Sequence, residues 1–223
     1  MEECISVFDM LKIGVGPSSS HTLGPWRAAE RFLEELRQDF DLNSITRVKV
    51  DLYGSLSLTG KGHATDLAVM LGLSGQDPEY IPVQDIDGII KAIENNHLIQ
   101  LGNEKALPFY ILQDIVFHKE FLPFHANGLT FTAFFENETE YASTFYSIGG
   151  GFVVKEERSN AKKKIAIKCA FPFPINNAAE LLDYTQKENK SISEIVYANE
   201  ISMRPEAEVH SELLRIWHTM LEC

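Results

Sequence analysis

The chain has few cysteines and no long hydrophobic run. Its three cysteines, Cys4, Cys169 and Cys223, lie far apart in 223 residues, so the sequence predicts neither a disulfide framework nor a self-contained zinc site. No apolar stretch approaches the roughly 20 residues of a membrane span, and the N-terminus lacks the basic region of a secretory signal. These absences favour a soluble protein in a reducing compartment, the cytoplasm.

Positive charge is also scarce. There are 20 Lys and Arg residues against 32 Asp and Glu residues, a formal net charge of −12. This balance repels phosphate backbones and anionic lipids unless basic residues cluster. The one basic run, Lys162–Lys164, follows the acidic pair Glu156 and Glu157 and is typical of a solvated loop. Nucleic-acid and membrane partners are therefore not expected.

Hydrophobic residues make up 44% of the chain and charged residues 23%, as in ordinary globular proteins. The apolar spacing predicts an α+β fold, with residues 1–155 as its core and residues 176–223 as a C-terminal helical segment. The pattern between residues 76 and 122 is unclear apart from a short helix over 86–96. The elements predicted elsewhere are helices over 26–40, 64–71, 178–187, 191–201 and 205–223, a strand over 46–53, and a hairpin over 129–135 and 141–146.

A serine-rich segment, Gly14-Val15-Gly16-Pro17-Ser18-Ser19-Ser20-His21-Thr22, has no apolar period and is predicted to be a loop. It lies just before a helix, where unpaired amides and the helix dipole attract anions such as a carboxylate or a phosphate. The alternative is a helix cap with a surface histidine. The segment matches neither the phosphate-binding P-loop nor the dinucleotide glycine pattern.

Two further segments carry histidines at turns. Thr59-Gly60-Lys61-Gly62-His63 is similar to a shortened nucleotide loop, but a histidine replaces the Ser or Thr that would bind magnesium. A histidine near a helix start is favoured in its neutral form, which can act as a base. His125 and Asn127 lie at a turn before a strand. A structural role is the alternative for both histidines, and the wide separation of His21, His63 and His125 disfavours a zinc site.

Four segments together resemble the β domain of iron–sulfur-dependent L-serine dehydratase. Members of this family convert L-serine to pyruvate and ammonia without pyridoxal phosphate. A 4Fe–4S cluster on a separate α domain or subunit supplies a Lewis acid, and its cysteine ligands are absent from this chain. The segments are residues 6–22, with Pro17-Ser18-Ser19-Ser20-His21-Thr22, residues 53–66, with Gly60-Lys61-Gly62-His63, residues 125–128, and residues 146–152, with Gly149-Gly150-Gly151.

The resemblance also implies a fold and an assembly. It implies a two-layer α+β sandwich with a mixed sheet, like the allosteric substrate-binding domain of phosphoglycerate dehydrogenase. It implies the cluster-bearing α domain and L-serine as partners, and we expect a homo-oligomer. The chain is then a fragment or a separate subunit of the complete enzyme.

The resemblance further implies roles for individual residues. His63 is the expected base, and His125 is a second acid/base or an orienting group. Substrate-binding residues are Ser18, Ser19, Ser20, His21, Lys61 and Asn127, with Lys61 placed to hold the carboxylate. Two other functions remain open at this point: a non-catalytic regulatory module that binds serine or another carboxylate, and a pure assembly subunit.

Overall fold

The computed structural model describes residues 5–156 and 171–223 of the chain. The chain divides into two compact units, Gly14–Asn160 and a combination of Met1–Ile13 with Ala161–Cys223. We call them the sheet unit and the helical unit. The N-terminal residues, which the sequence placed in the core of residues 1–155, group instead with the C-terminal helices.

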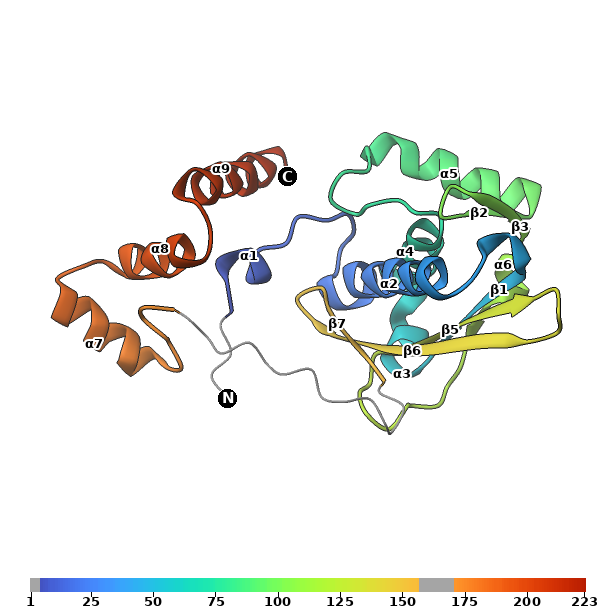
Figure 1. The fold of residues 1–223 in the computed structure, drawn as a ribbon, viewed down its shortest axis with the longest axis horizontal. Coiled ribbons are helices and arrows are strands. Elements are labelled where there is room, and N and C mark those ends of the chain that lie inside the picture. The colour runs from blue at the N-terminus through green and yellow to red at the C-terminus, as the bar shows by residue number, and fades with distance from the viewer. Residues whose placement is uncertain (1–4, 157–170) are drawn as a thin grey trace. The chain divides into compact units, whose positions relative to one another are not determined.

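The sheet unit is built on a five-stranded sheet with the strand order β4-β1-β5-β6-β7 (Figure 1). β4 pairs with β1 in parallel and the other neighbours are antiparallel, which confirms the predicted α+β class with a mixed sheet. The strands are β1 (Ile45–Leu52), β4 (Ile115–Phe117), β5 (Gly128–Phe135), β6 (Glu140–Gly149) and β7 (Phe152–Lys155).

The predicted hairpin is confirmed as β5 and β6, with Leu129 opposite Phe145. The turn from β6 to β7 contains the three successive glycines Gly149, Gly150 and Gly151, whose φ angles are 99°, 60° and 76°. These positive values explain the glycines, because side chains with a Cβ rarely adopt them.

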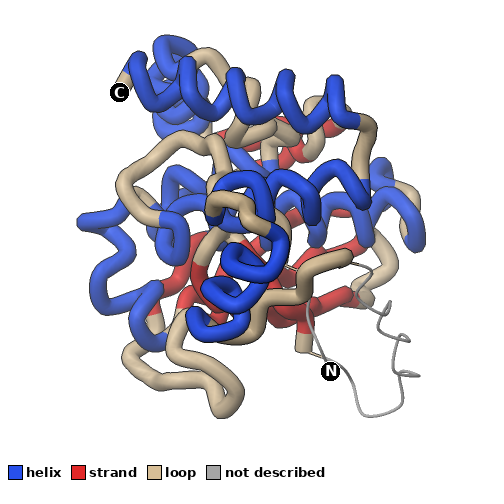
Figure 2. The backbone as a smooth tube through the Cα atoms, turned by 90° about the vertical axis from the view of Figure 1, so that its left-hand side faces the viewer, coloured by secondary structure: helices blue, strands red, loops and turns tan. Residues whose placement is uncertain are grey.

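Helix α2 (Gly24–Asp39) packs against the sheet, as its apolar face predicts. The ring of Phe32 stacks on that of Phe131 in β5, with 5.2 Å between centroids. Helix α4 (Thr65–Leu73) lies beside α2. A Cβ added at Gly72 would lie 2.7 Å from the Cβ of Ala29, so the glycine permits this close approach. Figure 2 shows the helices of the described residues in blue and the strands in red.

Between β1 and α4 the chain forms a short helix, α3 (Gly54–Thr59), and a 3₁₀ turn, η3 (Gly60–His63). The segment after α4, which the sequence left unclear apart from a helix over 86–96, contains mainly short elements. They are α5 (Val83–Asn96), β2 (Leu98–Leu101), β3 (Lys105–Pro108) and α6 (Ile111–Asp114). The predicted helix is confirmed as α5. Earlier in the chain, a 3₁₀ turn, η2 (Leu42–Ser44), precedes β1.

The helical unit contains α1 (Val7–Met10), α7 (Ala178–Glu188), α8 (Ile192–Met203) and α9 (Glu206–Glu222), close to the helices predicted for residues 178–223. Within it, the buried carboxylate of Glu200 accepts hydrogen bonds from the Oγ of Ser6 and the amide of Val7, each 2.7 Å long. Arg204 pairs with the same carboxylate at 2.9 Å. The hydrogen bonds from Ser6 and Val7 to the buried carboxylate join α8 to the N-terminal residues.

None of the helices in residues 5–156 and 171–223 is long and apolar enough to cross a membrane. The basic run Lys162–Lys164 and two of the cysteines, Cys4 and Cys169, lie outside the described residues.

Candidate active site

The serine-rich segment is more ordered than a loop. Residues Ser19–Leu23 form a π-helical turn, η1, that runs directly into α2. The Oγ of Ser18 accepts a hydrogen bond from the amide of His21 at 3.2 Å and so caps this turn. The prediction of a loop up to Thr22 was therefore wrong, because the serine cap starts helical hydrogen bonding before Gly24. The unpaired amides at this helix start belong to Ser19 and its neighbours rather than to Gly24.

The ring of His21 is held by a hydroxyl on each nitrogen. Its Nδ1 lies 2.9 Å from the Oγ of Ser20, and its Nε2 lies 2.9 Å from the Oγ of Ser55 in α3. Partial burial lowers the pKa of His21 below the ordinary value of 6.5, and the neighbouring His63 lowers it further, whereas an interaction with the backbone of Ser55 raises it. His21 is therefore neutral at pH 7, with a fixed ring orientation.

His63 ends the turn η3, directly before the left-handed residue Ala64 and helix α4. Its Nδ1 lies 2.9 Å from the carbonyl oxygen of Thr59. A carbonyl oxygen can only accept, so Nδ1 carries the proton. In the neutral ring Nε2 then has the free lone pair, which is the arrangement that a general base requires.

His21 and His63 lie side by side, with ring centroids 5.0 Å apart. Two buried threonines hold their backbones in a reciprocal way. Thr22, next to His21, donates to the carbonyl of His63 at 2.8 Å, and Thr65, close after His63, donates to the carbonyl of His21 at 2.6 Å. The structure thus brings together two of the predicted site residues that are far apart in the sequence.

The segments 125–128 and 146–152 connect to the same region through hydrogen bonds to backbone carbonyls. The Oγ of Ser147 in β6 donates to the carbonyl of Ser20 at 2.7 Å. The buried side-chain amide of Asn127 in turn donates to the carbonyl of Ser147 at 3.1 Å. The amide nitrogen of Asn127 therefore supports the serine segment. Its expected contact with substrate stays a prediction.

His125 is half-buried in the turn before β5, and its Nδ1 accepts from the amide of Asn127 at 3.1 Å. The next residue, Ala126, accepts a hydrogen bond from the amide of Ser55 at 2.9 Å. The turn that carries His125 is thus tied to the residue that holds His21, although the side chain of His125 makes no described contact with either histidine of the pair.

Two of the predicted residues lie apart from these contacts. Lys61 is exposed, and its Nζ lies 5.5 Å from the centroid of the Phe117 ring. Ser19 is exposed, and its side chain makes no hydrogen bond among the described residues. The proposed contact of Lys61 with the substrate carboxylate therefore requires its flexible side chain to leave the ring of Phe117.

The sequence did not single out four residues that build the site. Ser55 and Ser147 lie inside motifs that were quoted for the resemblance, but nothing in their spacing assigned them partners. The roles of Thr22 and Thr65 depend on contacts between segments more than 40 residues apart, as the hydrogen-bond separations show. One signal in the sequence pointed to these two threonines, namely that each carries a hydroxyl close to a motif histidine.

Comparisons with known proteins agree with the motifs. Residues 6–158 match the protein family described as serine dehydratase beta chain. The chain is 40% identical to L-serine dehydratase 1 of Escherichia coli and 39% identical to the L-serine dehydratase of Haemophilus influenzae, each match covering 98% of this chain and 48% of the relative. It is 41% identical to the L-serine dehydratase of Streptomyces coelicolor, over 98% of this chain and 49% of the relative.

The chain spans about half the length of the curated relatives it matches. The family match covers more than half of the chain, and it includes His21, His63, His125 and the residues that hold them. The chain therefore belongs to the serine dehydratase beta chain family.

Proposed function

We propose that this chain is the β part of an L-serine ammonia-lyase that converts L-serine to pyruvate and ammonia. The name of the family and of the matched relatives supports the substrate and the reaction. The observation that carries the proposal is the fixed His21–His63 pair, in which Nδ1 of His63 is occupied by a carbonyl and Nε2 is left as a base. The other half of the relatives supplies the remaining machinery.

The reaction begins with loss of the α-proton of L-serine, which requires a neutral base. In this proposal, Nε2 of His63 accepts that proton. The bond from Nδ1 to the carbonyl of Thr59 keeps the ring oriented and stabilises the imidazolium that forms. His21, whose pKa is lowered, remains uncharged beside it. A neutral neighbour avoids the like-charge repulsion that would oppose protonation of His63.

The substrate carboxylate is assigned to the start of the helix formed by η1 and α2. The first amides of a helix have no intrahelical partner and attract anions. The hydroxyls of Ser18, Ser19 and Ser20 belong to the residues at this helix start, and Lys61 supplies a mobile positive charge at the neighbouring turn. His125 and Asn127 complete the proposed set as an orienting group and a substrate contact.

The 4Fe–4S cluster of the complete enzyme is assigned to the other half. The described residues hold no group of three or more His, Cys, Asp or Glu side chains that could bind a metal ion. Cys223 is exposed near the end of α9, and the described residues do not fit a cluster. We therefore assign only proton transfer and substrate binding to this chain.

We further propose that the sheet unit is a two-layer sandwich akin to the allosteric substrate-binding domain of phosphoglycerate dehydrogenase. The packing of α2 on the mixed sheet supports this. The proposal also includes a homo-oligomeric enzyme in the cytoplasm.

The test is production of this chain alone and together with the other half of E. coli L-serine dehydratase 1. The chain alone is expected to be colourless, without stoichiometric iron and sulfide, and inactive. The assembled pair is expected to form pyruvate from L-serine. Binding of serine by the assembled pair without pyruvate would favour a regulatory module instead. A brown, active chain on its own would overturn the proposed division of labour.

A further inference from the structure

The helical unit buries few hydrophobic side chains. Among its described residues, the buried hydrophobic ones are Ile195, Val209 and Ile216, and α7 buries none. Exposed large hydrophobic side chains outnumber them and include Met203 and Trp217. A unit with so small a core cannot offset the conformational entropy lost on folding. Another surface must therefore complete its core.

Helix α9 shows where the missing contact lies. Val209 and Ile216 form a buried stripe along one side of the helix. Next to it, Leu214, Trp217 and Leu221 follow the spacing i, i+3, i+7 and so form a second apolar stripe. Their exposed fractions are 44%, 55% and 65%. We call this second stripe the α9 apolar face.

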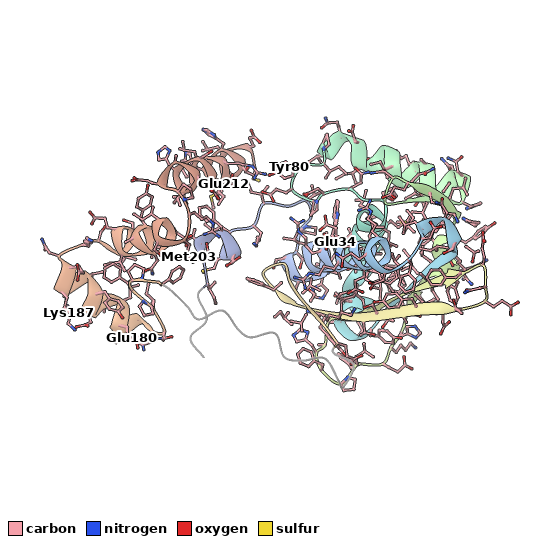
Figure 3. The ribbon with its side chains drawn as sticks, in the orientation of Figure 1. Glu34, Tyr80, Glu180, Lys187, Met203 and Glu212 are labelled. Atoms are coloured by element: carbon pink, nitrogen blue, oxygen red, sulfur yellow. The ribbon has the colours of Figure 1, made fainter. Side chains whose placement is uncertain are left out.

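Two acidic residues of α9 lie on the other side. Glu208 and Glu212 are about 140° and about 180° away from the middle of the α9 apolar face by the helical period of 3.6 residues. Figure 3 labels Glu212 on α9 and Met203 at the end of α8. The helix is therefore amphipathic. The described residues cover the stripe of Val209 and Ile216 and leave the α9 apolar face exposed.

A second observation indicates the same deficit. A cavity of about 440 Å³ opens within the helical unit. Its apolar walls come from the N-terminal segment, with Ile5 and Met10, from the segment before α7, with Ile175, and from α8, with Val196. An apolar side chain from another segment would fill it and would extend the small core.

The comparisons identify the occupant. The beta chain family match ends at residue 158, whereas the matches to whole L-serine dehydratases cover 98% of this chain. Residues 171–223 are thus shared with the relatives, outside the family match. About half of each relative has no counterpart in this chain. That half belongs to the same polypeptide as the matched residues in each relative, which makes it the occupant best placed to cover a face that the relatives also carry.

We propose that the α9 apolar face is a docking surface for the other half of the L-serine dehydratases, and that α7, α8 and α9 complete their core on that half. Trp217 is the central contact, because a large aromatic side chain at the middle of an apolar stripe is the usual anchor of an interface. The inference rests on the proposed function in one respect: it takes the other half as a working part of the same enzyme.

The experiment is co-expression of this chain, carrying an affinity tag, with the unmatched half of E. coli L-serine dehydratase 1. The wild-type chain is expected to retain that half through purification. Trp217→Asp and Leu214→Asp are each expected to reduce the retained amount tenfold or more. Leu112→Asp is the matched control, because Leu112 is 90% exposed in the sheet unit and should change nothing.

Iodide quenching of tryptophan fluorescence supplies a second measurement on the folded chain. Trp26 is 1% exposed and Trp217 is 55% exposed, so a Trp217→Phe variant isolates the unquenched signal of Trp26. Trp217 is expected to be quenched in the chain alone and protected in the assembled pair.

Three results would overturn the docking proposal: no retention of the E. coli half by the wild-type chain, full retention by both aspartate variants, or a Trp217 already protected in the chain alone, by self-association or otherwise. Both readouts report binding rather than turnover. A pair that binds through α9 but forms no pyruvate would therefore refute the proposed function and leave the docking surface intact.

Discussion

The imidazole rings of His21 and His63 lie 5.0 Å apart and are tilted by 36° to each other. Each ring has its own anchors, the hydroxyls of Ser20 and Ser55 for His21 and the carbonyl of Thr59 for His63. Two imidazoles at this distance disfavour double protonation, because like charges repel in a partly buried site. The protonation of one ring therefore depends on the other.

We expect the pKa of His21 in the folded chain to lie below 6.5, mainly because of burial and secondarily because of His63. His63→Ala should raise the pKa of His21 toward the ordinary value, because it removes the second cause of the lowering. Titration of the imidazole signals by NMR measures this shift. An unchanged pKa in His63→Ala would contradict the coupling of the two rings.

The lowered pKa of His21 also predicts how stability depends on pH. Between its folded pKa and 6.5, the unfolded chain binds more protons at this site than the folded chain does. The contribution of His21 to the free energy of unfolding should therefore fall as the pH decreases from 6.5 to that pKa. Urea unfolding of the wild type and of His21→Gln at pH 7.5 and 5.5 tests this. Equal losses in both proteins would assign the effect to other groups.

Ser20 and Ser55 are expected to act through His21. In the assembled enzyme, Ser55→Ala and Ser20→Ala each remove one hydrogen bond of about 1 kcal/mol, equivalent to roughly a fivefold lower kcat/KM. Ser57→Ala in the same short helix is the control, because Ser57 makes no side-chain hydrogen bond among the described residues. Steady-state kinetics over a range of serine concentrations measure the effect. Wild-type values for both variants would remove His21 from the functional site.

If Ser20 also holds the substrate carboxylate, its substitution should raise KM more than it lowers kcat. A contact made in both the ground state and the transition state has this signature. Ser19→Ala should behave in the same way, since its hydroxyl is free to reach a ligand. An unchanged KM in both variants would return the serine segment to the role of a helix cap.

Gly24 is expected to be required for the contact between η1 and β6. A Cβ at this position would lie 1.9 Å from the Oγ and 2.7 Å from the Cβ of Ser147. Gly24→Ala should therefore lower the free energy of unfolding by about 1–3 kcal/mol, as overpacking does. Urea unfolding, followed by the fluorescence of Trp26 in a Trp217→Phe background, provides the measurement.

Two further variants control this prediction. Ser147→Gly should relieve the loss in Gly24→Ala, because it removes both clashing atoms. Gly88→Ala in α5 has no atom within 4 Å of the new Cβ and should stabilise the chain by up to about 1 kcal/mol. Equal effects of the two glycine substitutions would contradict the steric argument.

The sequence predicted the longer elements because their patterns are local. The helix over residues 26–40, the strand over 46–53 and the hairpin of β5 and β6 each follow from regular apolar spacing. Short elements such as β2, β3 and β4 have no such pattern, since their burial depends on neighbours distant in sequence. The turn η1 was missed because it depends on the side-chain cap from Ser18.

The candidate site was predicted in part for the same physical reason. The motifs identified His21 and His63, but not that Thr22 and Thr65 hold them in a reciprocal pair, since that arrangement exists only in the folded chain. The expected contact of Asn127 with substrate stays a prediction, whereas the bond from its amide nitrogen to the carbonyl of Ser147 could not be foreseen from the motif. Residue types indicate possible chemistry, whereas hydrogen-bond partners need the fold.

The most direct test of the central claim compares His63→Ala with His118→Ala in the assembled enzyme. His118 is a suitable control, because its Nε2 lies 2.6 Å from Oδ1 of Asp51 and its ring stacks on Tyr53, so that its described side-chain contacts are with neither His21 nor His63. With His63 as the base, His63→Ala should lose on the order of 10²–10⁴-fold in kcat, while His118→Ala should alter mainly stability. A folded, assembled His63→Ala enzyme with near wild-type kcat would contradict the assignment of the base to this chain's His63.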